Sequence, residues 1–146
     1  MLKYQFPAVR GNQAGKEYYI CMVPMGLLSR IFLVGDSDVP PEYRAQRRLN
    51  EARIPEIRDY ILHNRDSYVF SALAASVDGN MEFVCSDTNE NVGTLNVDMD
   101  STFLINDGQH RRAAIEAAIE EDETLKEETI SVVIYKDQGL QRSQQM

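Results

Sequence analysis

The sequence has few cysteines and no long apolar run. Its two cysteines, Cys21 and Cys85, lie far apart without a Cys-x-x-Cys pair, and no charged segment followed by an apolar one opens the chain. A disulfide-rich secreted protein would carry more cysteines and such a leader. No apolar run approaches the ~18 residues that a membrane-spanning helix needs. These absences favour a cytoplasmic protein with reduced thiols and no membrane role.

Histidines and metal-binding motifs are equally scarce. His63 and His110 are the only histidines, and without a His, Cys and carboxylate cluster at ligand spacing we predict no zinc site. Asp98 and Asp100 are more typical of a solvated loop than of a Mg²⁺ site. The sequence has no Walker motif. We therefore predict no metal, and the residues alone identify no cofactor.

The chain also lacks an excess of basic residues. Its 15 Lys and Arg are outnumbered by 23 Asp and Glu, which gives a net charge of -8. This net charge argues against a protein that binds nucleic acid without sequence specificity, because the affinity of such proteins comes mainly from neutralising phosphates. The charge is nevertheless polarised, with acidic residues crowded between 120 and 128. Five arginines gather in one region of helical spacing: Arg44, Arg47, Arg48, Arg53 and Arg58.

This arginine cluster has two interpretations. In the first it is a solvated helix face, where Arg47 and Glu51, four residues apart, contribute only ~0.2–0.5 kcal/mol. In the second it contacts the phosphates of DNA or a nucleotide, because Arg44 and Arg48 are like charges at the same spacing and an anion would offset them. The sequence leaves both open.

The apolar pattern predicts an α+β fold with a mixed sheet and flanking helices. With 146 residues and 43% hydrophobic content, the chain is long enough for one domain and too short to expect two. We expect an edge strand or arm at 3–9, strands at 17–23, 68–77, 81–85, 93–97, 102–105 and 129–135, and helices at 27–34, 41–53 and 55–63. The first two strands should form a hairpin, as should 68–77 with 81–85. The strands at 102–105 and 129–135 suit a right-handed parallel crossover.

The stretch that organises the chain runs from Phe103 to Ile115 with the sequence FLINDGQHRRAAI. An apolar run ends in Asn-Asp-Gly and continues with helical spacing, which predicts a strand, a tight turn and a helix. Asp107 is the expected N-cap and Gly108 permits the turn. A core-facing helical stripe follows at residues 114, 115, 118 and 119.

The charge of this helix start is unusual. Arg111 and Arg112, with His110 beside them, sit in the first turn, where the helix dipole makes a cation cost roughly 0.3–1 kcal/mol. In one interpretation the turn binds phosphate or another anion through backbone N–H groups and guanidinium groups. In the other, Asp107 and nearby carboxylates neutralise the arginines and the turn is structural. The candidate anion-binding residues are Asp107, Gly108, Gln109, His110, Arg111 and Arg112.

The pentapeptide DGQHR at 107–111 is the signature of the DGQHR domain, and further stretches carry the same resemblance. They are FPAVRG at 6–11, RIPEI at 53–57, YVFSAL at 68–73 and RSQQM at 142–146. Together they resemble the DndB family of bacterial DNA sulfur modification proteins over nearly the whole chain. Members of that family are larger, so the resemblance implies that residues 1–146 are a single DGQHR domain from the N-terminal part of a longer protein.

The resemblance also implies a function. It implies a DNA-binding regulator that represses the operon for DNA phosphorothioate modification by occupying its promoter. Other sulfur modification proteins and a second copy of the chain are further candidate partners. DGQHR domains resemble the ParB and sulfiredoxin superfamily, whose corresponding turn binds nucleotide phosphates, so the alternative is a nucleotide-binding enzyme, an ATPase or a nuclease, with ATP as its cofactor. Sulfiredoxin chemistry needs a cysteine in the turn, and Gln109 stands there instead.

Overall fold

The computed structural model describes residues 2–32 and 52–136. In chain order the elements are β1 (Lys3–Gln13), β2 (Lys16–Pro24), the 3₁₀ turn η1 (Met25–Leu27), α1 (Leu28–Ile31), α3 (Arg53–His63), β3 (Leu73–Asp78), β4 (Met81–Cys85), β5 (Val92–Asp98), β6 (Thr102–Asp107), α4 (Gln109–Glu121), the 3₁₀ turn η4 (Glu123–Glu127) and β7 (Thr129–Lys136). Arg44, Arg47 and Arg48, the helix expected at 41–53 apart from Ala52 and Arg53, and the closing RSQQM lie outside the described residues.

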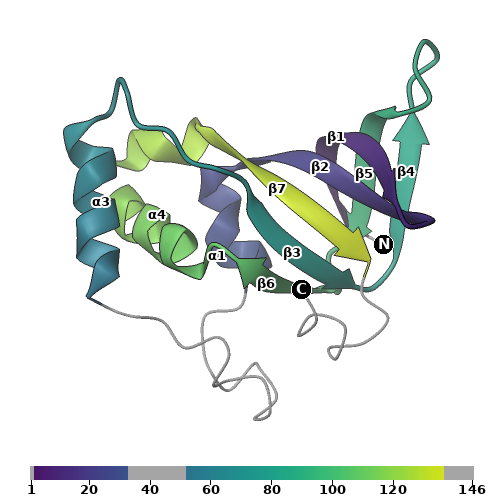
Figure 1. The fold of residues 1–146 in the computed structure, drawn as a ribbon. Coiled ribbons are helices and arrows are strands. Elements are labelled where there is room, and N and C mark those ends of the chain that lie inside the picture. Colours follow the sequence, from purple (N-terminus) through teal and green to yellow (C-terminus); the bar gives the residue numbers. More distant parts are fainter. Residues whose placement is uncertain (1, 33–51, 137–146) are drawn as a thin grey trace.

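The seven strands of the described chain join one mixed sheet in the order β4-β5-β1-β2-β7-β3-β6 (Figure 1). Every neighbouring pair is antiparallel except β3 and β7, which are parallel. The last strand, β7, therefore lies between β2 and β3 in the middle of the sheet. The predicted α+β fold with a mixed sheet is confirmed.

The predicted parallel crossover is wrong. β3 lies between β6 and β7, antiparallel to the first and parallel to the second, so β6 and β7 are antiparallel and are not neighbours. The physical reason is the burial of β3, where Leu73, Ala75 and Val77 are fully enclosed. A strand so apolar is best placed with a neighbour on each side.

The predicted hairpin of 68–77 with 81–85 is also wrong. β4 pairs with β5 at the opposite edge of the sheet from β3, and the turn around Gly79 carries the chain across instead of folding it back. β4 has the mostly exposed side chains of an edge strand, whereas β3 is buried. Residues 68–72 precede the strand and do not belong to it.

The N-terminal strand forms the expected hairpin with β2 but is not an edge strand. β1 lies between β5 and β2. Pro7 fits this interior position because pairing with β2 begins only at Ala8, so Pro7 has a paired neighbour on the β5 side alone. A proline suits a position with a paired neighbour on one side only, since it has no backbone N–H to donate to a second neighbouring strand.

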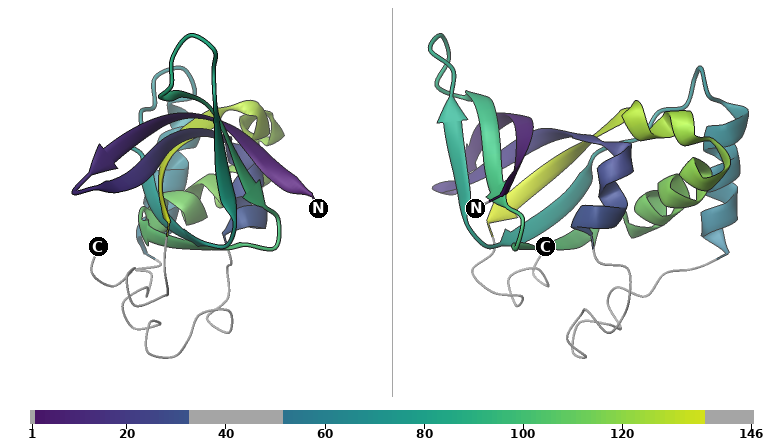
Figure 2. Two further views of the ribbon diagram at one scale, coloured as in Figure 1. Left: turned by 90° about the vertical axis from the view of Figure 1, so that its right-hand side faces the viewer. Right: turned by 180° about the vertical axis from the view of Figure 1, so that it is seen from behind.

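A continuous core joins the sheet to the helices. α1 and α4 lie against one face of the strongly twisted sheet (Figure 2), and α3 packs against α4. Ile115 and Ala118 of the predicted stripe are fully buried in this core, together with Ile61 of α3. Within the described ranges, every helix is too short or too polar to cross a membrane.

Candidate functional site

The signature turn joins the end of β6 to the start of α4 through a left-handed glycine. Gly108 has φ +104°, and a Cβ added to it would lie 2.3 Å from Cδ2 of Leu73. Only glycine combines that backbone conformation with so close an approach. The expectation that Gly108 shapes the turn is therefore confirmed.

Asp107 is not the N-cap of α4, which corrects the prediction. The N-cap is Gly108, without a side-chain cap, and the amide of Arg112 donates the helix's first hydrogen bond to the Gly108 carbonyl, 2.9 Å away. Because the left-handed residue takes the cap position, Asp107 remains one residue outside it as the last residue of β6. Its carboxylate is 79% exposed.

Arg111 holds the segment that leads into β3. Its Nη1 donates to the Ser71 carbonyl oxygen at 2.9 Å and also to the Ser71 hydroxyl. Its Nη2 lies 3.7 Å from Asp107 Oδ1, and its side chain is 18% exposed. The signature arginine is thus a clamp between the helix start and residues 68–72, with part of its guanidinium still open to solvent.

Arg112 has a different environment from its neighbour. It is buried, and its Nη1 pairs with Glu116 at 2.6 Å across one helical turn. Its Nε lacks a hydrogen-bond partner. A buried arginine held by one carboxylate stabilises the helix only while both partners are present. Arg112 is therefore a buried ion-pair partner of Glu116 within α4, and its guanidinium does not face solvent as that of Arg111 partly does.

The first turn of α4 carries no acidic residue. Gln109 and His110 are half-buried there, next to Arg111. The positive end of the helix dipole and the guanidinium group consequently act in the same direction, toward an anion. Asp107, on the strand side of the turn, is the nearest carboxylate to Arg111 for which an ion pair is seen.

The two described members of the arginine cluster differ in their surroundings. Arg53 is exposed at the beginning of α3. Arg58 lies farther along the helix, with Nε 3.0 Å from Asp59 and 3.7 Å from Glu121 of α4. Arg58 therefore contributes to the packing of α3 on α4, while Arg53 faces solvent.

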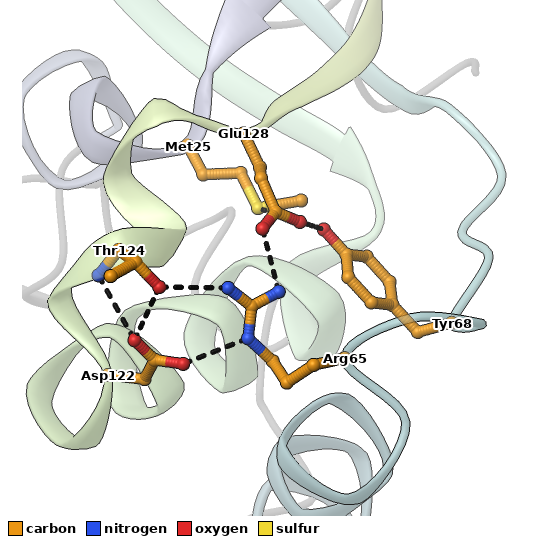
Figure 3. Close-up of polar contacts among 6 residues, drawn as sticks. All are labelled: Met25, Arg65, Tyr68, Asp122, Thr124 and Glu128. Carbon is orange, nitrogen blue, oxygen red and sulfur yellow. Dashed lines mark hydrogen bonds and ion pairs between the residues drawn. The ribbon is translucent and has the colours of Figure 1, made fainter.

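A polar network that the sequence did not reveal closes the other end of α4 (Figure 3). Arg65 donates to Asp122 at 2.9 Å, to Glu128 at 2.7 Å and to Thr124 at 2.9 Å. The Tyr68 hydroxyl donates to the second oxygen of Glu128. Residues about 60 positions apart thus fasten the chain after α3 to η4, and no local sequence pattern marks such a pairing.

This network stabilises the charged form of its carboxylates. The hydrogen bond from Tyr68, with that from Arg65, lowers the pKa of Glu128, and hydrogen bonds from Thr124 and Arg65 lower the pKa of Asp122. Burial and the bond to Glu128 raise the pKa of Tyr68 to about 12. At neutral pH the two carboxylates are therefore charged and the Tyr68 phenol is protonated, and such fixed protonation states suit a structural tie better than proton transfer.

The expectation that Asp98 lies in a solvated loop is wrong. Asp98 is buried at the end of β5, 4.0 Å from Lys3, and accepts a hydrogen bond from Asn80 at 3.2 Å. Cys21 is a free, buried thiol and Cys85 a free, exposed one. In the part of the chain that the structure describes, His, Cys, Asp and Glu do not gather into a group of three that could hold a metal ion.

Comparison with known proteins identifies the family. No curated protein and no solved structure matches the chain, so its likeness to the ParB and sulfiredoxin superfamily stays a prediction. One family model, described as DndB, DNA-sulfur modification-associated, matches residues 6–146. That match spans nearly the whole sequence and includes the signature turn, and the chain therefore belongs to the DndB family of proteins associated with DNA sulfur modification.

Proposed function

We propose that this chain is a DNA-binding regulator that represses the operon for DNA phosphorothioate modification by occupying its promoter. The observation that carries the proposal is family membership across residues 6–146. We further propose that residues 1–146 act as one domain, because the seven described strands share a single sheet. Promoter DNA is the proposed partner.

The beginning of α4 supports an affinity for phosphate. Arg111 is partly exposed beside a helix N-terminus whose first turn has no acidic residue. Backbone N–H groups and the helix dipole favour an anion at such a position, and a guanidinium group can add two parallel hydrogen bonds. Arg53, exposed on α3, is a second cation available to a phosphate backbone.

The same geometry supports a nucleotide-binding enzyme as the second candidate. A strand that runs through a left-handed glycine into a helix is an arrangement that binds nucleotide phosphates in other folds, and β6, Gly108 and α4 have this order. ATP would be the nucleotide in this case, and the activity that of an ATPase or a nuclease.

A gel-shift titration with operon promoter DNA over a salt series, beside an ATP hydrolysis assay, tests the proposal. A regulator should bind the DNA, lose affinity as salt rises and hydrolyse no ATP. Reversal of Arg44 and Arg48 to Glu should weaken binding and flatten the salt slope by roughly one unit for each lost phosphate contact. This expectation rests on sequence, since both arginines lie outside the described residues.

The matched control is a double reversal of Lys16 and Lys126 to Glu, which changes the net charge by the same amount at two exposed positions. It should leave the salt slope close to that of the wild type. An unchanged slope in the Arg44 and Arg48 variant would refute the proposed phosphate contacts. ATP hydrolysis that disappears in Arg111→Ala would favour the enzyme.

A further inference from the structure

The outer face of the sheet, opposite the core, exposes a row of apolar side chains. Val92 of β5 pairs with Val9 of β1, Val9 pairs with Ile20 of β2, and Ile20 pairs with Val133 of β7. Ala74 of β3 continues the row beside Val133. Paired residues point to the same face of a sheet, so these five side chains lie next to one another across five strands.

Two parallel rows flank this one. On one side the ring of Tyr18 covers the Cα of its partner Gly11 and stacks on Tyr135, with centroids 5.8 Å apart. The other row lies two residues along each strand in the opposite direction. It consists of Val84, Thr94, Pro7, Met22 and Ser131. We call these three rows the outer face.

None of the thirteen positions of the outer face is charged, and its central row ends at β6, where Ala74 pairs with the exposed Asp107. The whole chain is 26% charged, so about three charges would be expected there at the average composition. Val9, Ile20, Met22, Val84 and Val92 are nevertheless each 43% to 50% exposed. Missing charge combined with half-buried Tyr and exposed Met and branched aliphatic residues is the composition of an interface core.

We propose that the outer face is a surface through which two copies of this chain associate. DNA does not fit it, because the face has no Lys or Arg to neutralise phosphates. A second copy does fit, because a two-fold contact brings the same uncharged rows together. Each copy has a net charge of -8, so most other pairings of surfaces would oppose like charges.

The size of the outer face predicts a weak dimer. Its five central strands span about 19 Å at ~4.8 Å per strand, and its three rows span about 13 Å along the strands. With side-chain margins this comes to roughly 500 Å² per copy, below the ~800 Å² of a standard stable interface. Association should therefore depend on concentration, in the micromolar range or weaker.

Sedimentation equilibrium from about 1 µM to about 1 mM protein tests the proposal. The wild-type mass should rise from one copy toward two, and more steeply in high salt, which screens the repulsion between copies. Ile20→Glu should weaken association at least about tenfold. Val9→Lys places the opposite charge in the same row. It should weaken association by a similar factor if the cost comes from burying a charge in the contact and not from a change in net charge.

The matched control is Val69→Glu, at a valine that is 78% exposed and lies outside the three rows. It should associate like the wild type, and circular dichroism would verify that all variants are folded. A wild type that stays monomeric at the highest concentration overturns the proposal, as does dimerisation that survives both Ile20→Glu and Val9→Lys. DNA binding has the opposite salt dependence, so the failure of this interface and of the regulator proposal can be told apart.

Discussion

Arg111 and Ser71 are joined by two hydrogen bonds from a single guanidinium nitrogen, which reaches both the carbonyl and the hydroxyl oxygen of the serine. The signature arginine thus holds in place the strand-free segment that precedes β3. The same group is the leading candidate for binding phosphate. The Arg111 side chain thus has both a structural role and a candidate binding role. Measuring the free energy of unfolding and the DNA affinity of the same variant separates the two.

Arg111→Ala should lower both quantities. Loss of the bonds to Ser71 should reduce the free energy of unfolding by roughly 1–2 kcal/mol, because a charged donor contributes modestly at a partly exposed site. Loss of the exposed part of the guanidinium should remove most promoter DNA affinity. Ser71→Ala is the control, since it removes one acceptor and leaves Arg111 available to phosphate. Undiminished DNA affinity in folded Arg111→Ala would show that the arginine is purely structural.

Gly108→Ala should destabilise the fold by roughly 2–4 kcal/mol, which combines a strained left-handed backbone with a clash against Leu73. Gly15→Ala provides a comparison, because Gly15 also has a positive φ but has open space where the methyl group would stand. That variant should lose only about 1 kcal/mol. Urea denaturation of both proteins measures the difference, and equal losses would rule out the close approach to Leu73 as the cause.

Stability should fall on both the acid and the alkaline side of neutrality. The pKa values of Glu128 and Asp122 are lowered in the folded protein, so their contribution is present above their unfolded pKa values of ~4 and is lost as the pH falls through the folded ones. The pKa of Tyr68 is raised to about 12, so its contribution is complete below ~10 and is lost as the pH rises from there toward 12.

Tyr68→Phe and Arg65→Met separate these two limits. Tyr68→Phe should reduce the alkaline loss of stability, and both variants should reduce the acid loss, since each removes a donor to Glu128. Thermal melts at pH intervals from about 3 to about 11 provide the measurement. Acid profiles identical to the wild type in both variants would contradict the network as the source of the pH dependence.

The two thiols should react at very different rates in the folded protein. Burial raises the pKa of Cys21 to about 12, so its thiolate, the reactive form, is scarce at neutral pH. Cys85 is exposed on β4. A thiol reagent should therefore label one cysteine quickly in native protein and two after denaturation. Equal fast labelling of both native thiols would contradict the buried position of Cys21.

Local patterns predicted the elements well and their neighbours poorly. The stripe that includes Ile115 and Ala118 and the glycine at 108 follow from residues a few positions apart, and both are where the sequence placed them. The sheet order depends instead on which buried strands pack together over long separations. Nothing near Leu73 specifies that its neighbour will be Val132.

The candidate site shows the same division. The sequence located Arg111 and Arg112 in one helical turn but could not show that Arg112 turns inward to Glu116 while Arg111 reaches across to Ser71. Side chains on successive helical positions point about 100° apart, so adjacent arginines enter different surroundings. The partners of Arg65 lie 57 to 63 residues away, beyond the reach of any spacing rule.

The central position of β7 determines when this protein can fold during its synthesis. Before β7 leaves the ribosome, β4, β5, β1 and β2 can form one sheet, and β3 and β6 another, but no strand joins the two. The strand edges of β2 and β3 that pair with β7 then stay unpaired, because β7 is translated last among the described elements. Unpaired strand edges are prone to pair with other chains, so the nascent protein is most exposed to aggregation until β7, which ends at Lys136, has left the ribosome.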